Sequence, residues 1–258
     1  MIKHEIKNRF TGDVQFVADI ECHEDTLTSI KIGLSVKWAV KNDADLSDAN
    51  LSRADLSDAD LSDADLSRAY LSRSDLSRAN LIRANLSRAD LSDAHLSGVN
   101  LSDADLSDAN LSDANLIGVN LSGADLFDAD LIGVNLIGVN LSDADLSGAD
   151  LRRADLFDAD LSRADLSDAN LSGAYLRDAD LVDGGQRSDG YRFVGWIKDG
   201  VLQVRAGCRN FTITEARKHW SSVGYPDRKR GDETLCILDH IEKVAVIRGL
   251  VIEVSENG

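Results

Sequence analysis

The residues best suited to catalysis or metal binding are few and scattered along the chain. They are His4, His23, His95, His219, His240, Cys22, Cys208 and Cys236. None of them forms an HExxH motif, a CxxC pair or another metal-ligand spacing. The chain also has no glycine-rich loop of the kinds that bind nucleotide phosphates. The sequence therefore predicts no metal site and no cofactor.

One short segment places a nucleophile close to a base and a carboxylate. Cys236 lies just before Asp239 and His240. The segment is predicted to be helical, and neighbours on one helix seldom form a nucleophilic site. We therefore predict that the protein is not an enzyme.

Aspartate is the abundant charged residue, and it follows a repeat. Leucine occupies every fifth position from Leu46 to Leu181, which gives 28 consecutive copies. The residue before each leucine is Asp or Asn in 25 of the 28 copies. The residue two before it is alanine except at five positions: Ser74, Val99, Val119, Val134 and Val139. The unit is thus A-(D/N)-L-S-x over residues 44–183, and it lacks the glycine-rich nonapeptide of calcium-binding β-rolls.

A period of five fits neither a helix nor a flat strand. On an α-helix each step of five residues rotates a side chain by about 140°, so the leucines would form no stripe. On a strand an odd spacing sends successive leucines to opposite faces. Leucine and alanine can both stay inside only if the chain turns once per repeat, so that four repeats close a square coil. Asp and Asn are expected at the corners, because their side chains can accept hydrogen bonds from nearby backbone amides.

This pattern resembles the pentapeptide-repeat family over residues 44–183. The resemblance implies an all-β solenoid, a right-handed quadrilateral β-helix with the central leucine and the preceding alanine or valine inward. Four repeats per coil give about seven coils and a rod roughly 30–35 Å long. The central residue is always leucine here, whereas relatives also use phenylalanine. The loop insertions of some quinolone-resistance members are absent.

The flanking segments have no repeat. Residues 1–43 are predicted to be an N-terminal cap with a strand in 10–20 and a helix in 26–41. Residues 184–258 are predicted to be a small α+β module. A hairpin of 191–198 and 201–206 is expected around Asp199-Gly200. A capping box of Thr212 and Glu215 should begin a short helix to about Ser221, and a second helix should run from Asp232 to before Gly249.

All of the excess negative charge lies on the repeats. They hold 28 Asp and 10 Arg, a net charge of −18, whereas the flanks have a net charge of +1. Duplex DNA carries one charge per about 1.7 Å, so rod and duplex are comparable in charge per length. The resemblance also implies imitation of DNA, because several relatives inhibit or protect DNA gyrase and are thought to imitate duplex DNA. A simpler interpretation stays open, in which Asp only keeps the rod soluble.

Residues twenty apart should stack on one side of a four-repeat coil. The side that contains Leu46 and Leu66 has the largest net charge, −8, against −1, −4 and −5 for the others. Arg68 and Arg88 are the only arginines of the repeats on this side, so they alone offset the charge of its aspartates. We name these ten aspartates the acidic face and predict that they bind the partner: Asp45, Asp48, Asp65, Asp105, Asp108, Asp125, Asp128, Asp145, Asp165 and Asp168.

Two further surface features follow from the same stacking. Ile117, Ile137 and Phe157 replace outward serines and form a predicted apolar stripe, covered either by the C-terminal module or by a second copy in a homodimer. Five consecutive corner arginines form a basic ring: Arg68, Arg73, Arg78, Arg83 and Arg88. The ring could contact nucleic acid or neutralise neighbouring aspartates.

Three functional hypotheses follow. The first is an acidic, non-enzymatic DNA mimic that binds and inhibits or modulates a DNA-processing enzyme, with gyrase or topoisomerase IV as the leading target. The second is a phage-derived DNA mimic that inhibits a bacterial defence nuclease complex, and the third is a scaffold rod whose C-terminal module binds a protein partner. The net charge of −17 argues against direct binding to nucleic acid or to an anionic membrane. The sparse cysteines and the absence of a signal-like segment favour the cytoplasm.

Overall fold

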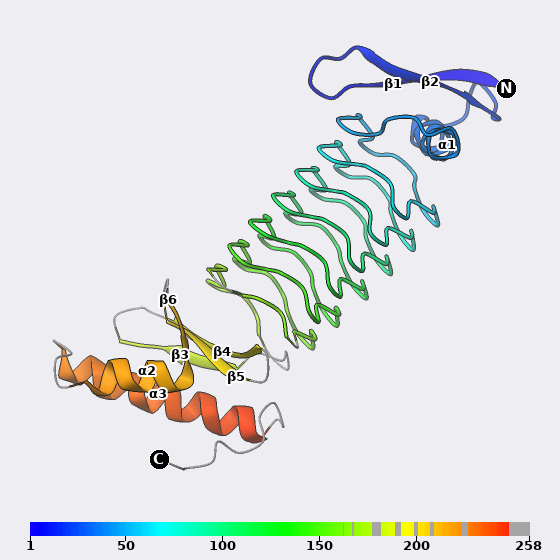
Figure 1. The fold of residues 1–258 in the computed structure, drawn as a ribbon. Helices are drawn as coiled ribbons and strands as arrows, with labels where there is room; N and C mark the ends of the chain where they lie inside the picture. The colour runs from blue at the N-terminus through cyan, green and yellow to red at the C-terminus, as the bar shows by residue number, and fades with distance from the viewer. Residues whose placement is uncertain are drawn as a thin grey trace.

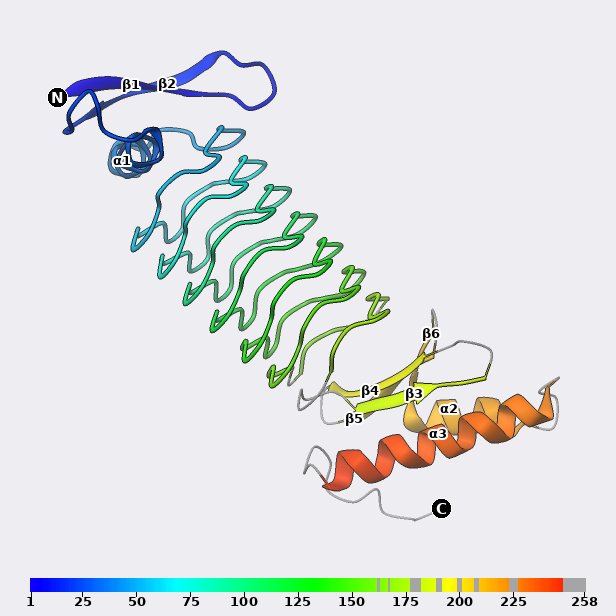
Figure 2. The same ribbon diagram turned by 180° about the vertical axis from the view of Figure 1, so that it is seen from behind.

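The computed structural model describes residues 1–161, 163–166, 168–176, 182–188, 192–198, 201–206, 209–222 and 227–247. The repeats form a rod. The N-terminal strands and first helix lie at one end of it, and the C-terminal sheet and helices lie at the other (Figure 1). The view from behind shows the same order (Figure 2). The sides of the rod therefore extend between two separate flanking structures.

Backbone bridges join residues twenty apart along the rod. The series begins with Asn50 and Tyr70 and ends with Asp155 and Tyr175, and the joined segments are parallel. Because twenty residues are four pentapeptides, this register confirms the predicted coil of four repeats. Each bridge involves a single residue per segment, so the coils are held by ladders rather than by long strands. The count of about seven coils stays a prediction, since residues 177–181 lie outside the described residues.

Each repeat has two outward positions that matter for the surface. The residue before the leucine makes the bridge, and we call this the bridge position. For example, the Tyr70 N–H donates to the Ala49 carbonyl at 2.9 Å, and the Leu71 N–H donates to the Asp90 carbonyl at 2.8 Å. The second residue after the leucine is the corner position.

A tight turn forms every corner. In the turn after Leu71, the Ser74 N–H donates to the Leu71 carbonyl at 3.1 Å. The corner residues other than glycine have φ between 54° and 60°, whereas the preceding serines do not have positive φ. This is the pattern of a type II turn. Aspartate and glycine adopt positive φ more readily than most residues, and the corner position of the repeats holds only Asp, Arg and Gly.

The prediction that the Asp and Asn before each leucine form the corners is wrong. Those residues lie at bridge positions, and the serine and the corner residue make the turn. Their predicted hydrogen bonds to nearby amides are confirmed. The Ser47 N–H, for example, donates to Oδ1 of Asp45 at 2.9 Å.

The interior of the rod is uniform. Every repeat leucine from Leu46 to Leu176 is buried, and the alanine or valine two residues before it is buried in nearly every coil. Full burial of a leucine side chain contributes about 2 kcal/mol, so the leucine columns offset a large part of the entropy lost on folding. Ser74 is the one inward serine of the repeats, and it is buried with its hydroxyl unpaired.

The N-terminal segment contacts the first coil. Strands β1 (Ile2–Lys7) and β2 (Val14–Ile20) pair antiparallel, and α1 (Thr28–Lys41) follows them. The Asn50 N–H donates to the Lys7 carbonyl at 2.8 Å, and the Asp55 N–H donates to the Ser29 carbonyl at 3.0 Å. Gly33 of α1 lies so close to the Asp55 carbonyl that a Cβ there would overlap it.

The C-terminal segment forms a four-stranded antiparallel sheet with two helices. The strands β3 (Val182–Gln186), β4 (Arg192–Lys198), β5 (Val201–Ala206) and β6 (Arg209–Thr212) follow one another across the sheet. Helices α2 (Ile213–Ser221) and α3 (Arg228–Ile247) lie on the side away from the rod (Figure 1). Val194 and Trp196 of β4 join the core of the rod, whereas Phe193 joins the core of the helices.

Most predicted flanking elements are present, with some errors at their limits. The strand in 10–20, the helix in 26–41, the β4–β5 hairpin and the capping box of Thr212 and Glu215 are confirmed. Asp199-Gly200 of the hairpin turn lies outside the described residues. Helix α3 begins at Arg228, so the predicted start at Asp232 is wrong. The sequence reasoning missed β1, β3 and β6.

Candidate functional site

The rod brings the bridge-position aspartates of the acidic face into one column. Parallel bridges join Asp105 to Asp125, Asp125 to Asp145, and Asp145 to Asp165. Bridges through Asn85 extend the column to Asp65, and Asp45 precedes it in the first coil. Segments joined in this way lie about 4.8 Å apart. The bridges therefore align five of the ten predicted residues, and Asp45 continues the column in sequence.

The turn that follows the aspartate holds the column carboxylates wherever that turn is described, namely at Asp45, Asp65, Asp105, Asp125 and Asp145. Oδ1 of Asp105 accepts the Ser107 N–H at 3.0 Å and the Ser107 hydroxyl at 2.6 Å. Oδ1 of Asp145 accepts the same pair from Ser147 at 2.9 and 2.6 Å. These bonds fix the direction of the side chains. Asp45, Asp65 and Asp125 are exposed, and the other three are half-buried.

The corner-position aspartates of the acidic face differ among themselves. Asp48 pairs with Arg68 at 2.7 Å, and Asp108 pairs with Arg88 at 3.2 Å. Asp128 instead lies over Gly148, where a Cβ would overlap its Oδ1. The two ion pairs reduce the negative charge of the N-terminal half of the face. The remaining charge is concentrated in the half that contains Asp125 to Asp168.

The five arginines of the basic ring all form ion pairs along the rod. Each contacts an aspartate twenty residues away, at the corner position of a neighbouring coil. The pairs are Arg68–Asp48, Arg73–Asp93, Arg78–Asp58, Arg83–Asp63 and Arg88–Asp108. Hydrogen bonding from Arg78 lowers the pKa of Asp58 below its usual value. The structure therefore favours the neutralising interpretation of the ring.

Sequence reasoning missed Phe127 on the acidic face. Its side chain is 45% exposed and lies between Asp125 and Asp128 in the chain. The sequence carries the signal, because Phe127 interrupts the serine column that contains Ser107 and Ser147. Exposed aromatic rings are enriched at protein-binding surfaces.

The apolar stripe lies on a different side of the rod. Ile117 is 45% exposed, Phe157 is 36% exposed and Ile137 is half-buried. The described part of the C-terminal module packs against the end of the rod through Val194 and Trp196. Ile117 and Phe157 are exposed beside this described part, and the two alternatives for the stripe, the module and a second copy, both stay predictions.

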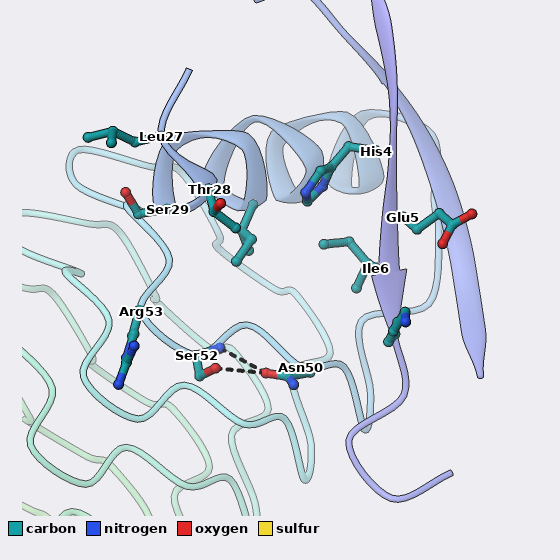
Figure 3. Close-up of a pocket in the computed structure, with 11 residues that line it drawn as sticks. His4, Glu5, Ile6, Leu27, Thr28, Ser29, Asn50, Ser52 and Arg53 are labelled. Carbon is teal, nitrogen blue, oxygen red and sulfur yellow. Dashed lines mark hydrogen bonds between the residues drawn. The ribbon is translucent and has the colours of Figure 1, made fainter. Parts of the chain in front are cut away.

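A hollow of about 610 Å³ lies between β1, the start of α1 and the first coil (Figure 3). His4 points toward α1, and its Nδ1 lies 3.0 Å from the Ser35 hydroxyl. Burial, with help from the charge of Lys31, lowers the pKa of His4, so the ring is neutral at pH 7. Arg53 points away along the rod, and Glu5 points away from the hollow. The Ser35 hydroxyl is fully buried and donates to the Lys31 carbonyl at 2.8 Å, so the contact with His4 does not present a nucleophile to the hollow.

The Cys236 segment also lacks a catalytic arrangement in the described residues. Asp239 accepts a hydrogen bond from Arg217 at 2.7 Å, and no hydrogen bond joins Cys236 to His240 within the described part of α3. Among the residues that the structure describes, no group of three His, Cys, Asp or Glu could hold a metal ion. No helix of the described chain is long and apolar enough to cross a membrane.

Comparison with known proteins identifies the repeat. The family model for pentapeptide repeats, built of eight copies, matches residues 42–78, 84–123, 104–143, 124–163 and 144–183. Together these ranges cover more than half of the chain. Among curated proteins, no sequence matches significantly.

Several solved structures are similar to parts of the chain. HetL, a pentapeptide repeat protein of heterocyst differentiation regulation from the cyanobacterium Nostoc sp. strain PCC 7120, is 35% identical over 53% of this chain and 80% of its own, with a TM-score of 0.34. A thylakoid lumen pentapeptide repeat protein of Arabidopsis thaliana is 30% identical over 40% and 64%, with a TM-score of 0.30. QnrB1, a plasmid-mediated fluoroquinolone resistance protein, is 23% identical over 45% and 76%, with a TM-score of 0.21.

Proposed function

Because this chain belongs to the pentapeptide-repeat family, whose members fold as right-handed quadrilateral β-helices, we propose that it is a non-enzymatic protein that imitates duplex DNA. In this proposal the acidic face occupies the DNA-binding groove of a DNA-processing enzyme and inhibits or modulates that enzyme. The resemblance described above suggests gyrase or topoisomerase IV as the first target to test.

One observation carries the proposal, namely the alignment of the aspartates in register along the rod. Bridges hold Asp105, Asp125, Asp145 and Asp165 in one column. With a net charge of −18 over a length of roughly 34 Å, the repeats carry one net charge per about 2 Å, close to the linear charge density of B-DNA. A groove lined by lysine and arginine for DNA would attract such a surface.

The test exchanges aspartate for asparagine, which can still accept the turn hydrogen bonds. Asn85 already occupies the same column and accepts the Ser87 N–H at 3.1 Å. The ridge variant combines four substitutions: Asp105→Asn, Asp125→Asn, Asp145→Asn and Asp165→Asn. The control variant makes the same charge change on two other sides of the rod: Asp55→Asn, Asp75→Asn, Asp90→Asn and Asp130→Asn. Both variants should fold, because all eight sites are bridge positions.

The assay is DNA supercoiling by gyrase, measured between about 50 and 200 mM salt. The unmodified protein should inhibit, and salt should weaken inhibition by screening the charges. The ridge variant should lose inhibition, whereas the control variant should retain most of it. If the ridge variant inhibits as well as the unmodified protein, the acidic face is not the binding surface.

If gyrase and topoisomerase IV are both unaffected, the target is wrong although mimicry can still hold. A pull-down from bacterial lysate at low and high salt then distinguishes the alternatives. A defence nuclease complex that is captured at low salt and released at high salt supports the second hypothesis. The scaffold hypothesis predicts the reverse pattern, with binding that survives the ridge variant and is lost on removal of residues 184–258.

A further inference from the structure

Phe127 changes the chemistry of the acidic face at one point. It occupies the position after the leucine, where the other described residues of its column are serines: Ser47, Ser67, Ser87, Ser107 and Ser147. Its side chain is 45% exposed. Among the described residues, no aromatic ring or cation lies against it.

The phenylalanine at position 127, in place of the serine of this column, also changes the hydrogen bonds that Asp125 accepts. Ser107 and Ser147 each donate both an N–H and a hydroxyl to the preceding aspartate. Phe127 donates only its N–H, at 2.9 Å, to Oδ1 of Asp125. The Asp125 carboxylate therefore has one donor fewer than its neighbours in the column, and it is exposed where Asp105 and Asp145 are half-buried.

The rod itself shows what such a carboxylate can accept. Arg152 occupies the position in its repeat that Phe127 occupies in its own. Its Nε donates to both oxygens of Asp150 at 2.9 Å, and its Nη2 lies 2.7 Å from Oδ2. A bridge-position carboxylate in this fold thus binds a guanidinium while it keeps its turn hydrogen bond.

The N-terminal segment shows how an arginine docks on the outside of the rod. The Arg9 guanidinium carbon lies 5.5 Å from the centre of the Tyr70 ring, which projects from a bridge position. Its Nη1 also donates to the carbonyls of Arg68 and Ala69 at 2.9 and 3.1 Å. An aromatic ring and adjacent oxygens therefore hold a guanidinium on this surface.

Building on the proposed function, we propose that Phe127 and Asp125 form a docking subsite for an arginine side chain of the protein partner. The guanidinium stacks on the Phe127 ring and donates to the Asp125 carboxylate. A planar guanidinium can do both at once, whereas a lysine ammonium lacks the fork and stacks less well. Asp128 and Asp145 add negative charge around the subsite, and they favour a cation over an apolar side chain there.

The test uses the full chain and two small probes, triarginine amide and trilysine amide. The ring signals of the six phenylalanines are followed by NMR during each titration. We expect the Phe127 signals, assigned from Phe127→Ser, to move at lower concentrations of triarginine than of trilysine. Since an exposed cation–π contact contributes modestly, the difference in affinity should be about two- to fivefold.

Two serine substitutions provide the matched comparison. Phe127→Ser restores the residue of its own column, so the variant should fold, and its affinity for triarginine, read from the backbone amide signal of Asp125, should fall to that for trilysine. Ile117→Ser removes a side chain of the same exposure. The Ile117 N–H donates to Asn115 rather than to an aspartate, so this variant should leave both affinities unchanged. The proposal is overturned if Phe127→Ser keeps the preference for arginine, or if the Phe127 signals do not move.

The subsite and the DNA mimicry can fail separately. If the ridge variant loses gyrase inhibition but Phe127→Ser keeps the arginine preference, only the subsite is wrong. If Phe127→Ser loses that preference while the ridge variant still inhibits, Phe127 and Asp125 bind arginine, but the acidic face is not the surface that inhibits gyrase.

Discussion

Arg78 and Asp58 are twenty residues apart in sequence and one coil apart in the rod. The Nε and Nη2 of Arg78 donate to the two carboxylate oxygens of Asp58 at 2.8 and 2.7 Å. The pair marks the register of four repeats on the outside of the molecule, as the bridges do in the backbone. Any change in the number of repeats must respect that register to keep a surface column intact.

Removing repeats should therefore have effects that depend on their number. Deletion of residues 119–123 removes one uncharged repeat and moves Asp125, Asp145 and Asp165 to another side of the rod. Deletion of residues 104–123 removes a whole coil and leaves the later aspartates on the acidic face. Both proteins should fold, as judged by circular dichroism, because the leucine columns remain continuous. The five-residue deletion should weaken partner binding more, although it keeps the net charge; equal binding would show that the partner does not need a continuous column.

The free energy of unfolding should depend on whether the corner residue tolerates a positive φ, and only weakly on the ion pair that the corner residue makes. Arg78 has φ near 58°, and its pair with Asp58 is exposed. Arg78→Gly should change the free energy of unfolding by less than about 1 kcal/mol, because relief at positive φ offsets a weak surface pair. Arg78→Val should lower it by about 1–2 kcal/mol, since a β-branched residue tolerates positive φ poorly. Urea unfolding measures the free energy of both variants. Equal values for Arg78→Gly and Arg78→Val would contradict the importance of positive φ at the corner.

Gly33 should resist substitution although it lies within a helix. Alanine is the better helix former by about 1 kcal/mol, so Gly33→Ala would stabilise an isolated helix. In the protein a Cβ there would overlap the Asp55 carbonyl, and the helix must move away from the first coil. We expect a net loss of about 1–3 kcal/mol in urea unfolding. Lys37→Ala, on the exposed side of α1, is the control and should have little effect.

The rod should lose stability in acid through its hydrogen-bonded aspartates. Burial alone would raise the pKa of Asp75, but hydrogen bonds from the hydroxyl and N–H of Ser77 hold the pKa below its usual value of 3.8. Because the folded state has the lower pKa, this contribution is present above pH 3.8 and is lost as the pH falls below that value. Urea midpoints in about 0.5 M salt, which screens repulsion among carboxylates, should change little from pH 7 to 5 and then fall. Ser77→Ala should make the urea midpoint fall less in acid. An equal fall in this variant would contradict the claim that the Ser77 hydrogen bonds to Asp75 cause the loss of stability.

The apolar stripe should determine whether the protein self-associates. Ile117→Ser combined with Ile137→Ser places in the stripe the residue found at 57, 77 and 97. If the stripe joins two copies, analytical ultracentrifugation should show a dimer for the unmodified protein and a monomer for the variant. Phe127→Ser is the control, because it lies on another side of the rod. A monomer at high concentration for the unmodified protein would contradict the homodimer.

The rod could be predicted from sequence because its pattern has few solutions. From Leu46 onward, a strict period of five with two inward residues requires a turn in every repeat, and four turns close the coil. The location of the turn was harder to predict. Asp65 and Ser67 are both turn-forming residues, and only the structure shows that Asp65 makes the bridge while Ser67 enters the corner.

The candidate site could be predicted in part. Stacking of Asp105 on Asp125 follows from the period alone. The pairing of Asp48 with Arg68 depends on side-chain direction at positive φ, which the pattern does not specify. Strand β1 was missed because its apolar residues, Ile2 and Ile6, are separated by charged ones and depend on pairing with β2.

The uniform interior has a consequence for how the chain folds. Since nearly every coil contributes the same leucines and alanines to the core, a segment displaced by one repeat during folding would bury the same groups as the native one. The native alignment must then be favoured by features that differ between coils, such as corner ion pairs and the contacts of the two flanks. Refolding is therefore expected to pass through slipped species whose correction is slow, even though each coil forms from local contacts.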